Sequence, residues 1–152
     1  MSDTLFKHIL VPSDGSEPSQ RAAHVAVDLA KRLGARITAL HAMQPQALVV
    51  PDMTGGFTYL MPDELYERAV KAQARTITDG ITQLARSANV PCDTVTMTSG
   101  VPWQAIIDTA AARGCDAIVM ASHGRTGVSA LLMGSETTKV LTHCKLPVLV
   151  TR

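Results

Sequence analysis

Short apolar segments alternate with helical ones along the whole chain, and this order restricts the fold more than any other feature. Residues 8–12, 36–42, 94–97, 117–120 and 146–150 have the length and composition of strands. Four helical segments lie between them, and each connects one strand to the next. A connection that carries a helix joins parallel strands, so the pattern predicts a parallel sheet with helices on both faces.

Each helical segment carries its own start, stop or periodicity signals. The first follows Ser16, a candidate N-cap with Pro18 in its first turn, and stops at Gly34. The third spans 102–113 and is closed by Gly114, and the fourth spans 135 to about 143. The second begins near residue 62 or 63 and has a buried stripe of Val70, Ala74, Ile77, Ile81 and Leu84.

Gly80 lies inside this second helix. Glycine there costs about 1 kcal/mol relative to alanine, which makes close packing at this position plausible.

We therefore expect an α/β fold: a single, open, five-stranded parallel sheet, Rossmann-like, with strand order 3-2-1-4-5. The 152 residues fit one domain spanning 1–152, and no internal repeat or linker is visible. The exception is the segment of about residues 44–61, which contains Pro45, Pro51, Gly55 and Gly56. A connection of this length is either functional, as a lid or partner surface, or simply a mobile loop.

Composition excludes several classes of function. The formal charge is +1 and the cations are dispersed, unlike the basic stripe of a nucleic-acid-binding protein. No apolar run approaches the roughly 18 residues that span a bilayer, and residues 1–7 do not resemble a signal peptide. We expect a cytoplasmic protein with no nucleic-acid or membrane partner. Three separated cysteines and five scattered histidines indicate neither a disulfide framework nor a dedicated transition-metal site.

The stretch 121–135 is the strongest candidate for a binding site. A strand ends there, a loop with Gly124, Gly127 and Gly134 follows, and a helix opens at Ser135. Glycines allow backbone N–H groups to approach an anion, and the helix dipole favours negative charge at its start. In a parallel sheet this loop should meet residues 12–16 and 42–43, which also follow strands. The sequence contains neither a Walker A motif nor a G-x-G-x-x-G after the first strand.

The spacing of this loop resembles the signature of the universal stress protein family. That signature is Gly, two residues, Gly, nine residues, Gly, then Ser or Thr. Here nine residues separate Gly124 from Gly134, and Ser135 follows. The similarity extends to residues 9–16, 40–42 and 147–150, which match the family's opening strand and turn, the end of its second strand and its closing strand.

The resemblance implies an adenine-nucleotide site. Asp14 would lie against the ribose or the metal-bridged phosphates, with Pro12 and Ser13 near the base. The backbone of Ala42 would recognise adenine, and Met120 and Ala121 would run beside the ribose. The phosphates would be approached and enclosed by Gly124, Arg125, Gly134, Ser135, Glu136 and Thr137. ATP is the implied ligand, with Mg²⁺ carried by the nucleotide and Asp14 as its possible protein contact.

Several of these residues have a simpler structural reading. Asp14 could have no binding role and simply cap the turn or the helix that follows it. His123 could contact phosphate or pack into the loop, Arg125 could be merely solvated, and Lys139 should lie on an exposed helix face. Ala121 replaces the first glycine of the signature, and the cost of its methyl group depends on whether that position needs a positive φ.

We expect a stress-response protein that binds ATP and acts as a nucleotide-dependent sensor or regulator, not a dedicated catalyst. A second reading is an interaction module of the same fold that binds no nucleotide, and a third is a slow ATP hydrolase. The final strand should lie at a sheet edge, where two copies could pair as a homodimer. Bound nucleotide could order the segment 44–61, and an unidentified protein partner would then bind its surface. Trp103 and the apolar group Val128, Ala130, Leu131, Leu132 and Met133 would serve in packing or subunit contact.

Overall fold

Five strands form one parallel sheet in the order β5-β2-β1-β6-β7 in a computed structural model of the protein. The structure describes residues 5–45, 48–60, 64–125 and 132–152. Along the chain the elements are β1 (His8–Pro12), α1 (Glu17–Leu33), β2 (Arg36–Met43), β3 (Leu48–Pro51), β4 (Phe57–Leu60), α2 (Glu64–Ser87), β5 (Cys92–Thr98), α3 (Pro102–Arg113), β6 (Ala117–Ala121), α4 (Ser135–His143) and β7 (Val148–Thr151).

The sheet confirms the predicted fold class and strand order, because β5-β2-β1-β6-β7 is the order 3-2-1-4-5 once β3 and β4 are set aside. The differences lie at element ends. The strand expected at 94–97 extends over Cys92–Thr98, and the final strand begins at Val148 instead of Leu146.

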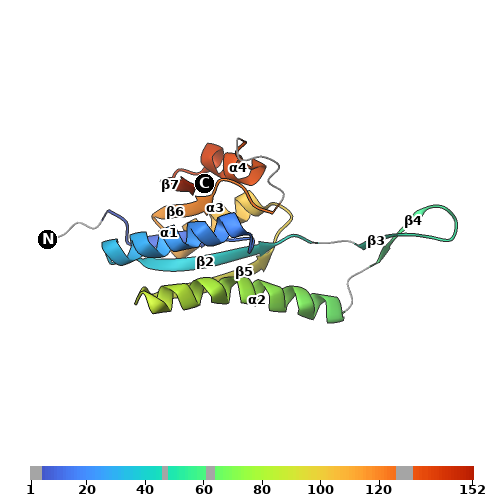
Figure 1. Ribbon diagram of the computed structural model, residues 1–152. Helices are drawn as coiled ribbons and strands as arrows, with labels where there is room; N and C mark the ends of the chain where they lie inside the picture. Colours follow the sequence, from blue (N-terminus) through green and yellow to red (C-terminus); the bar gives the residue numbers. More distant parts are fainter. Residues whose placement is uncertain (1–4, 46–47, 61–63, 126–131) are drawn as a thin grey trace.

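Two separate cores cover the two faces of the sheet (Figure 1). On one face Ile9, Val11 and Val119 pack against α1 and α2. On the other face Leu10, Ile118 and Met120 pack against α3 and α4. Neighbouring strand residues point to opposite faces, which explains why β1 and β6 are buried along their whole length. Among the described helices, none is long and apolar enough to cross a membrane.

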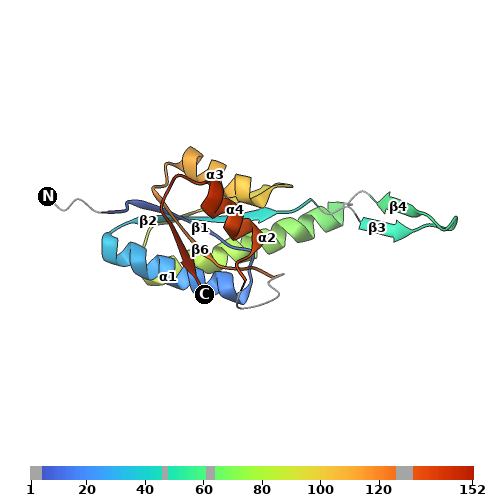
Figure 2. The same ribbon diagram turned by 90° about the horizontal axis from the view of Figure 1, so that it is seen from above.

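The segment between β2 and α2 contains an antiparallel hairpin that the sequence did not indicate. Strands β3 and β4 pair with Leu48 opposite Leu60 and Pro51 opposite Phe57. Both views show this hairpin projecting beyond the sheet and its helices (Figure 2). Of the predicted 44–61 segment, residues 46–47 and 61 lie outside the described residues.

Two glycines have open surroundings but opposite conformational roles. Gly114 ends α3 with φ of 65°, and its N–H bonds the carbonyls of Ala110 and Ala111. Gly80 lies within α2, and a Cβ there would meet no atom within 4 Å. The suggestion of close packing at Gly80 is therefore wrong: the helix is solvated at this position.

These surroundings predict opposite effects for one chemical change. Gly114→Ala should lower the free energy of unfolding by about 1 kcal/mol, because alanine is disfavoured at positive φ. Gly80→Ala should raise it by about 0.5–1 kcal/mol, because alanine is the better helix former. Urea denaturation of both variants measures the difference. Shifts of the same sign in both variants would contradict the assigned backbone conformations.

Candidate functional site

The candidate site lies at the carboxyl ends of β1 and β6, where the strand order reverses. From β1 the chain continues to β2 on one side, whereas β6 pairs with β1 on the other. Such a reversal opens a crevice between the loops that leave the two strands. The loops here are residues 13–16 after β1 and residues 122–134 after β6.

Asp14 joins these two loops. Its Oδ1 accepts a hydrogen bond from the amide of Ser16 at 2.9 Å, and its Oδ2 accepts one from the amide of Arg125 at 2.8 Å. The first bond closes an Asx turn ahead of α1, and the second connects segments 111 residues apart. Asp14 therefore does more than the capping that was its simpler reading.

The hydrogen bonds also set the charge state of this carboxyl. Burial by itself raises the pKa of Asp14, but bonds from the hydroxyl and amide of Ser16 and from the amide of Arg125 outweigh it. The net result is a pKa below the ordinary aspartate value. Asp14 is consequently ionised at neutral pH and places a negative charge at the crevice.

Glycine at two positions permits this close approach of the loops. A Cβ on Gly124 would collide with Oδ2 of Asp14. Gly15 has φ of 79°, and a Cβ there would lie 2.9 Å from the side chain of Ile77 and 3.2 Å from the guanidinium of Arg125. The Arg125 side chain thus lies against the first loop, while Ile77 brings α2 against the same point.

The far end of the second loop is fixed to β6. The amide of Gly134 bonds the carbonyl of Ser122 at 2.7 Å, and the hydroxyl of Thr137 bonds the carbonyl of Ala121 at 2.9 Å. A Cβ on Gly134 would lie 3.2 Å from both the Ser122 carbonyl oxygen and Cα of His123. These contacts place the start of α4 at the end of β6.

The start of α4 differs from the starts of α1 and α3 in its capping. Ser16 accepts the amide of Ser19 in α1, and the carboxylate of Glu136 accepts the amide of Trp103 in α3 at 2.8 Å. At the start of α4, Gly134 is the N-cap and provides no side-chain hydrogen bond. Its first-turn amides therefore have no described side-chain cap, which is the arrangement that binds anions.

The Glu136 side chain has a structural role. Besides capping α3, its other carboxylate oxygen lies 3.5 Å from the ammonium of Lys139. Trp103 then stacks on His143 of α4 with ring centroids 4.7 Å apart. Glu136 contributes its backbone to the uncapped turn, while its side chain joins α3 to α4.

The backbone groups of Ala42 face the β1 side of β2, beyond the end of β1. The carbonyl of Leu40 accepts the amide of Ser13 on the β1 side, and the carbonyl of Met43 accepts the amide of Ser99 on the β5 side. Because the polar groups of successive strand residues face opposite edges, the N–H and C=O of Ala42 face the β1 side. There β1 has already ended, since Pro12 pairs with Leu40.

Ala121 keeps an ordinary strand backbone. It pairs with Thr151 at the end of β6, and Asn89 is the only described residue besides glycine with a positive φ. The methyl group at this signature position therefore has no conformational penalty. Met120 packs among the α3 and α4 residues, so alternation places the Ala121 side chain on the α1 face of the sheet.

The predicted site residues lie at or just after the carboxyl ends of β1, β2 and β6 and at the start of α4, and their part in binding stays a prediction. Pro12 and Met120 are buried within β1 and β6. Residues 126–131, including Gly127, Val128, Ala130 and Leu131, lie outside the described residues. Leu132 and Met133 of the same apolar group are exposed.

Two residues that bond the loop after β1 were not predicted from the sequence. Nδ1 of His41 is hydrogen-bonded to the carbonyl oxygen of Ser13 at 2.7 Å, and the hydroxyls of Ser19 and Ser13 are hydrogen-bonded to each other at 2.9 Å. The position of His41 beside Ala42 was its only sequence signal. His123 bonds Ser122 through Nδ1 at 2.9 Å, in agreement with packing into the loop.

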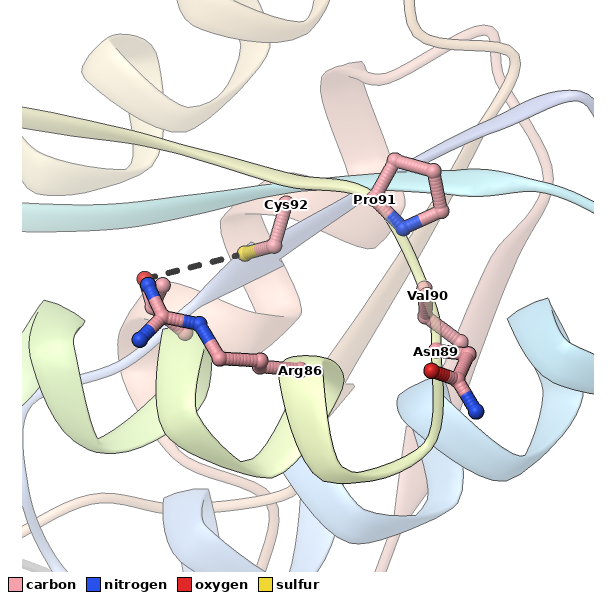
Figure 3. A pocket seen from close by; sticks show the side chains of 6 residues that line it. Arg86, Asn89, Val90, Pro91 and Cys92 are labelled. Atoms are coloured by element: carbon pink, nitrogen blue, oxygen red, sulfur yellow. Dashed lines mark hydrogen bonds between the residues drawn. The ribbon is translucent and has the colours of Figure 1, made fainter.

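A surface hollow lies at the opposite end of the sheet, where α2 ends and β5 begins (Figure 3). Arg86, Asn89, Pro91 and Cys92 are among its lining residues. The Thr82 hydroxyl contacts Cys92 Sγ at 3.9 Å, and burial raises the pKa of this thiol. Cys92 is therefore protonated and poorly nucleophilic at neutral pH. In the described residues, His, Cys, Asp and Glu form no group of three that could hold a metal ion.

Two curated relatives match the chain over nearly its full length. A universal stress protein of Thermus aquaticus is 32% identical over 97% of this chain and 100% of its own. The universal stress protein YxiE of Bacillus subtilis is 30% identical over the same two shares.

Solved structures agree with the fold. The universal stress protein UspA of Lactobacillus plantarum superposes with a TM-score of 0.73 at 27% identity, covering 96% of this chain and 97% of that one. A universal stress protein in complex with cAMP has a TM-score of 0.71 at 19% identity, covering 97% of each chain. One from Archaeoglobus fulgidus in complex with dAMP has a TM-score of 0.67 at 19% identity, covering 97% and 99%.

The sequence model described as the universal stress protein family matches residues 5–152. It spans the sheet, both loops of the crevice and the amino end of α4, and the chain belongs to the universal stress protein family.

Proposed function

We propose that this protein binds an adenine nucleotide, ATP with Mg²⁺, in the crevice between residues 13–16 and 122–137. The observation that carries the proposal is that, among the described residues, no side chain caps the start of α4, whereas Ser16 caps α1 and Glu136 accepts the amide of Trp103 in α3. Free first-turn amides and the helix dipole suit a phosphate group. Proteins of this fold that hold cAMP and dAMP support the adenine nucleotide as ligand class.

Different residues of the proposed site would contact the base, the ribose and the phosphates of the nucleotide. Outward backbone groups of Ala42 suit the edge of adenine, with Pro12 and Ser13 beside it. Met120 and Ala121 end β6 at the level of the ribose. The backbone of Gly124, the cation of Arg125 and the turn from Gly134 to Thr137 suit the phosphates.

Asp14 is the one carboxylate of this set that reaches across both loops, and its ionised state suits a magnesium ion carried by the nucleotide. Mg²⁺ would balance the negative charges of Asp14 and the phosphates.

We further propose that nucleotide occupancy is read as a signal in a cytoplasmic stress response, in place of turnover. A ligand that bridges the two loops would change the population of their tied arrangement, which is the physical basis of such a sensor. An unidentified protein partner would recognise the occupied state.

The proposed ligand gives a direct binding prediction. Mg-ATP should release heat in isothermal titration and raise the melting temperature at millimolar concentration, because a ligand that binds the native state stabilises it. Gly134→Asp should weaken binding by at least about tenfold, since it places a side chain against the Ser122 carbonyl and a negative charge beside the phosphates.

Gly80→Asp is the matched control, because it adds the same charge at a glycine with open surroundings. It should bind like the unchanged protein. Absence of both heat and thermal shift in the unchanged protein would exclude the nucleotide and favour an interaction module. Normal binding by Gly134→Asp would exclude the assigned site.

The hydrogen bond between Asp14 and the amide of Arg125 predicts that Asp14 contributes to the free energy of unfolding in a pH-dependent way. The folded-state pKa is lowered, so this contribution is present above the unfolded pKa of about 4 and disappears as pH falls through the folded value. Asp14→Asn should lower the free energy of unfolding by about 1 kcal/mol at pH 7, because the amide nitrogen cannot accept the Arg125 N–H.

Chemical denaturation of both proteins at pH 7, 5, 4 and 3 measures this difference. The gap should be constant above pH 5 and shrink toward pH 3. A gap that is unchanged at pH 3 would show that the carboxylate charge does not stabilise the tie.

We propose a homodimer through β7, which lies at the edge of the sheet with Leu149 exposed. The carbonyl of Thr151 faces β6, so the backbone of Val150 faces the free edge. Sedimentation at micromolar concentration should give twice the mass of one chain. Val150→Pro removes an outward N–H and should shift the mass toward the monomer without loss of helical circular dichroism. A monomer mass for the unchanged protein would contradict this dimer.

A further inference from the structure

The hairpin of residues 48–60, here called the arm, lies outside the five-stranded sheet. In the part of the chain that the structure describes, β3 and β4 pair only with each other. Figures 1 and 2 show the arm extending away from the sheet and from α2. Phe57 in β4 is 70% exposed, and Met53 in the turn is fully exposed.

An arm of this kind is unstable as an isolated unit. Two antiparallel strands alone are marginally stable in water, and a third strand or a packed surface is needed for independent stability. The turn is well made: Asp52 Oδ1 accepts the amides of Thr54 and Gly56, each at 2.9 Å, and the Thr54 hydroxyl at 2.6 Å. The remaining requirement is a partner for the strands.

The two outer edges of the arm differ in their capacity to pair. The amide of Asp52 bonds the carbonyl of Gly56, so these two residues face each other within the hairpin. By alternation Val50 and Thr58 also face inward, and the backbones of Pro51, Phe57 and Tyr59 face outward. Because proline has no N–H, the β3 edge lacks a backbone hydrogen-bond donor at Pro51 and is less able to pair with another strand. The β4 edge keeps both its donors and its acceptors.

Charge indicates which partner suits this edge. Residues 44–60 contain a single charged side chain, Asp52, and its carboxylate is used by the turn. A neutral strand offers nothing to orient an acidic or basic peptide. It does allow an identical strand to approach without like-charge repulsion.

We infer that the arm is a self-association site, in which β4 pairs antiparallel with β4 of a second copy to form a four-stranded sheet. The register with Thr58 on the two-fold axis, opposite Thr58 of the second copy, is the one that pairs the two outward residues of β4 with each other. Phe57 then lies opposite the second copy's Tyr59 and exchanges both backbone hydrogen bonds with it. This site is separate from the β7 edge and from the nucleotide crevice.

Cysteine cross-linking tests this register. Residues opposite one another in a non-hydrogen-bonded pair have Cα atoms about 4.5 Å apart, within the range of a disulfide. Thr58→Cys should therefore form a disulfide-linked dimer under mild oxidation at micromolar concentration. Its rate should exceed that of Thr54→Cys by at least about tenfold, because paired thiols experience a much higher effective concentration than colliding chains.

Thr54→Cys is the matched control, since Thr54 is also exposed but lies in the turn. The unchanged protein shows any disulfide that Cys92, Cys115 or Cys144 forms by itself. Equal rates for the two variants, or no dimer with Thr58→Cys, would overturn the inference, and an arm that binds another protein's strand would give that result.

Charge variants supply a readout that does not depend on thiols. Thr58→Lys and Thr58→Glu should each weaken self-pairing, because like charges then lie opposite one another. Tagged Thr58→Lys chains should capture Thr58→Glu chains about fivefold better than they capture their own kind. Both chains also carry Val150→Pro, so that pairing through β7 does not contribute to capture. Capture that is then independent of the charge at position 58 would contradict the pairing, whether or not the protein binds a nucleotide.

Discussion

The carboxylate of Asp14 is the constraint on which the geometry of the crevice depends. One oxygen closes the turn into α1, and the other holds the loop after β6 through the Arg125 amide. A single ionised group thus fixes the distance between two segments that the sheet alone would leave free. Gly124 is required at this point because any side chain would occupy the place of the carboxylate.

The remaining contacts transmit this constraint to the body of the protein. Gly15 lies between Ile77 of α2 and the Arg125 guanidinium, so the first loop is in contact with both. At the other end, Thr137 and Gly134 hold α4 to the end of β6, and Glu136 extends that connection to α3. The two loops are therefore in contact with elements from both faces of the sheet.

Much of this could be predicted because local patterns decide it. Buried strands such as His8–Pro12, the Ser16 cap and the stop at Gly34 follow from composition and short-range geometry. The hairpin at 48–60 could not be foreseen, because its strands contain proline and flank a glycine-rich turn typical of loops. The capping of α3 by Glu136 depends on how two helices pack, and the backbone of Ala121 on its pairing with Thr151.

The hydrogen bonds of Asp14 also bear on how a bound nucleotide would alter the two loops. Both carboxylate oxygens already accept backbone amides. A nucleotide-bound cation that recruits Asp14 would have to share or replace the Arg125 bond, which leads directly into the loop that precedes α4. Nucleotide binding, as proposed, would therefore be coupled to the separation of the two loops through the Asp14–Arg125 hydrogen bond. Such a coupling would lower the affinity for the nucleotide and would change the arrangement of the loops on binding, which suits the proposed sensor better than a catalyst.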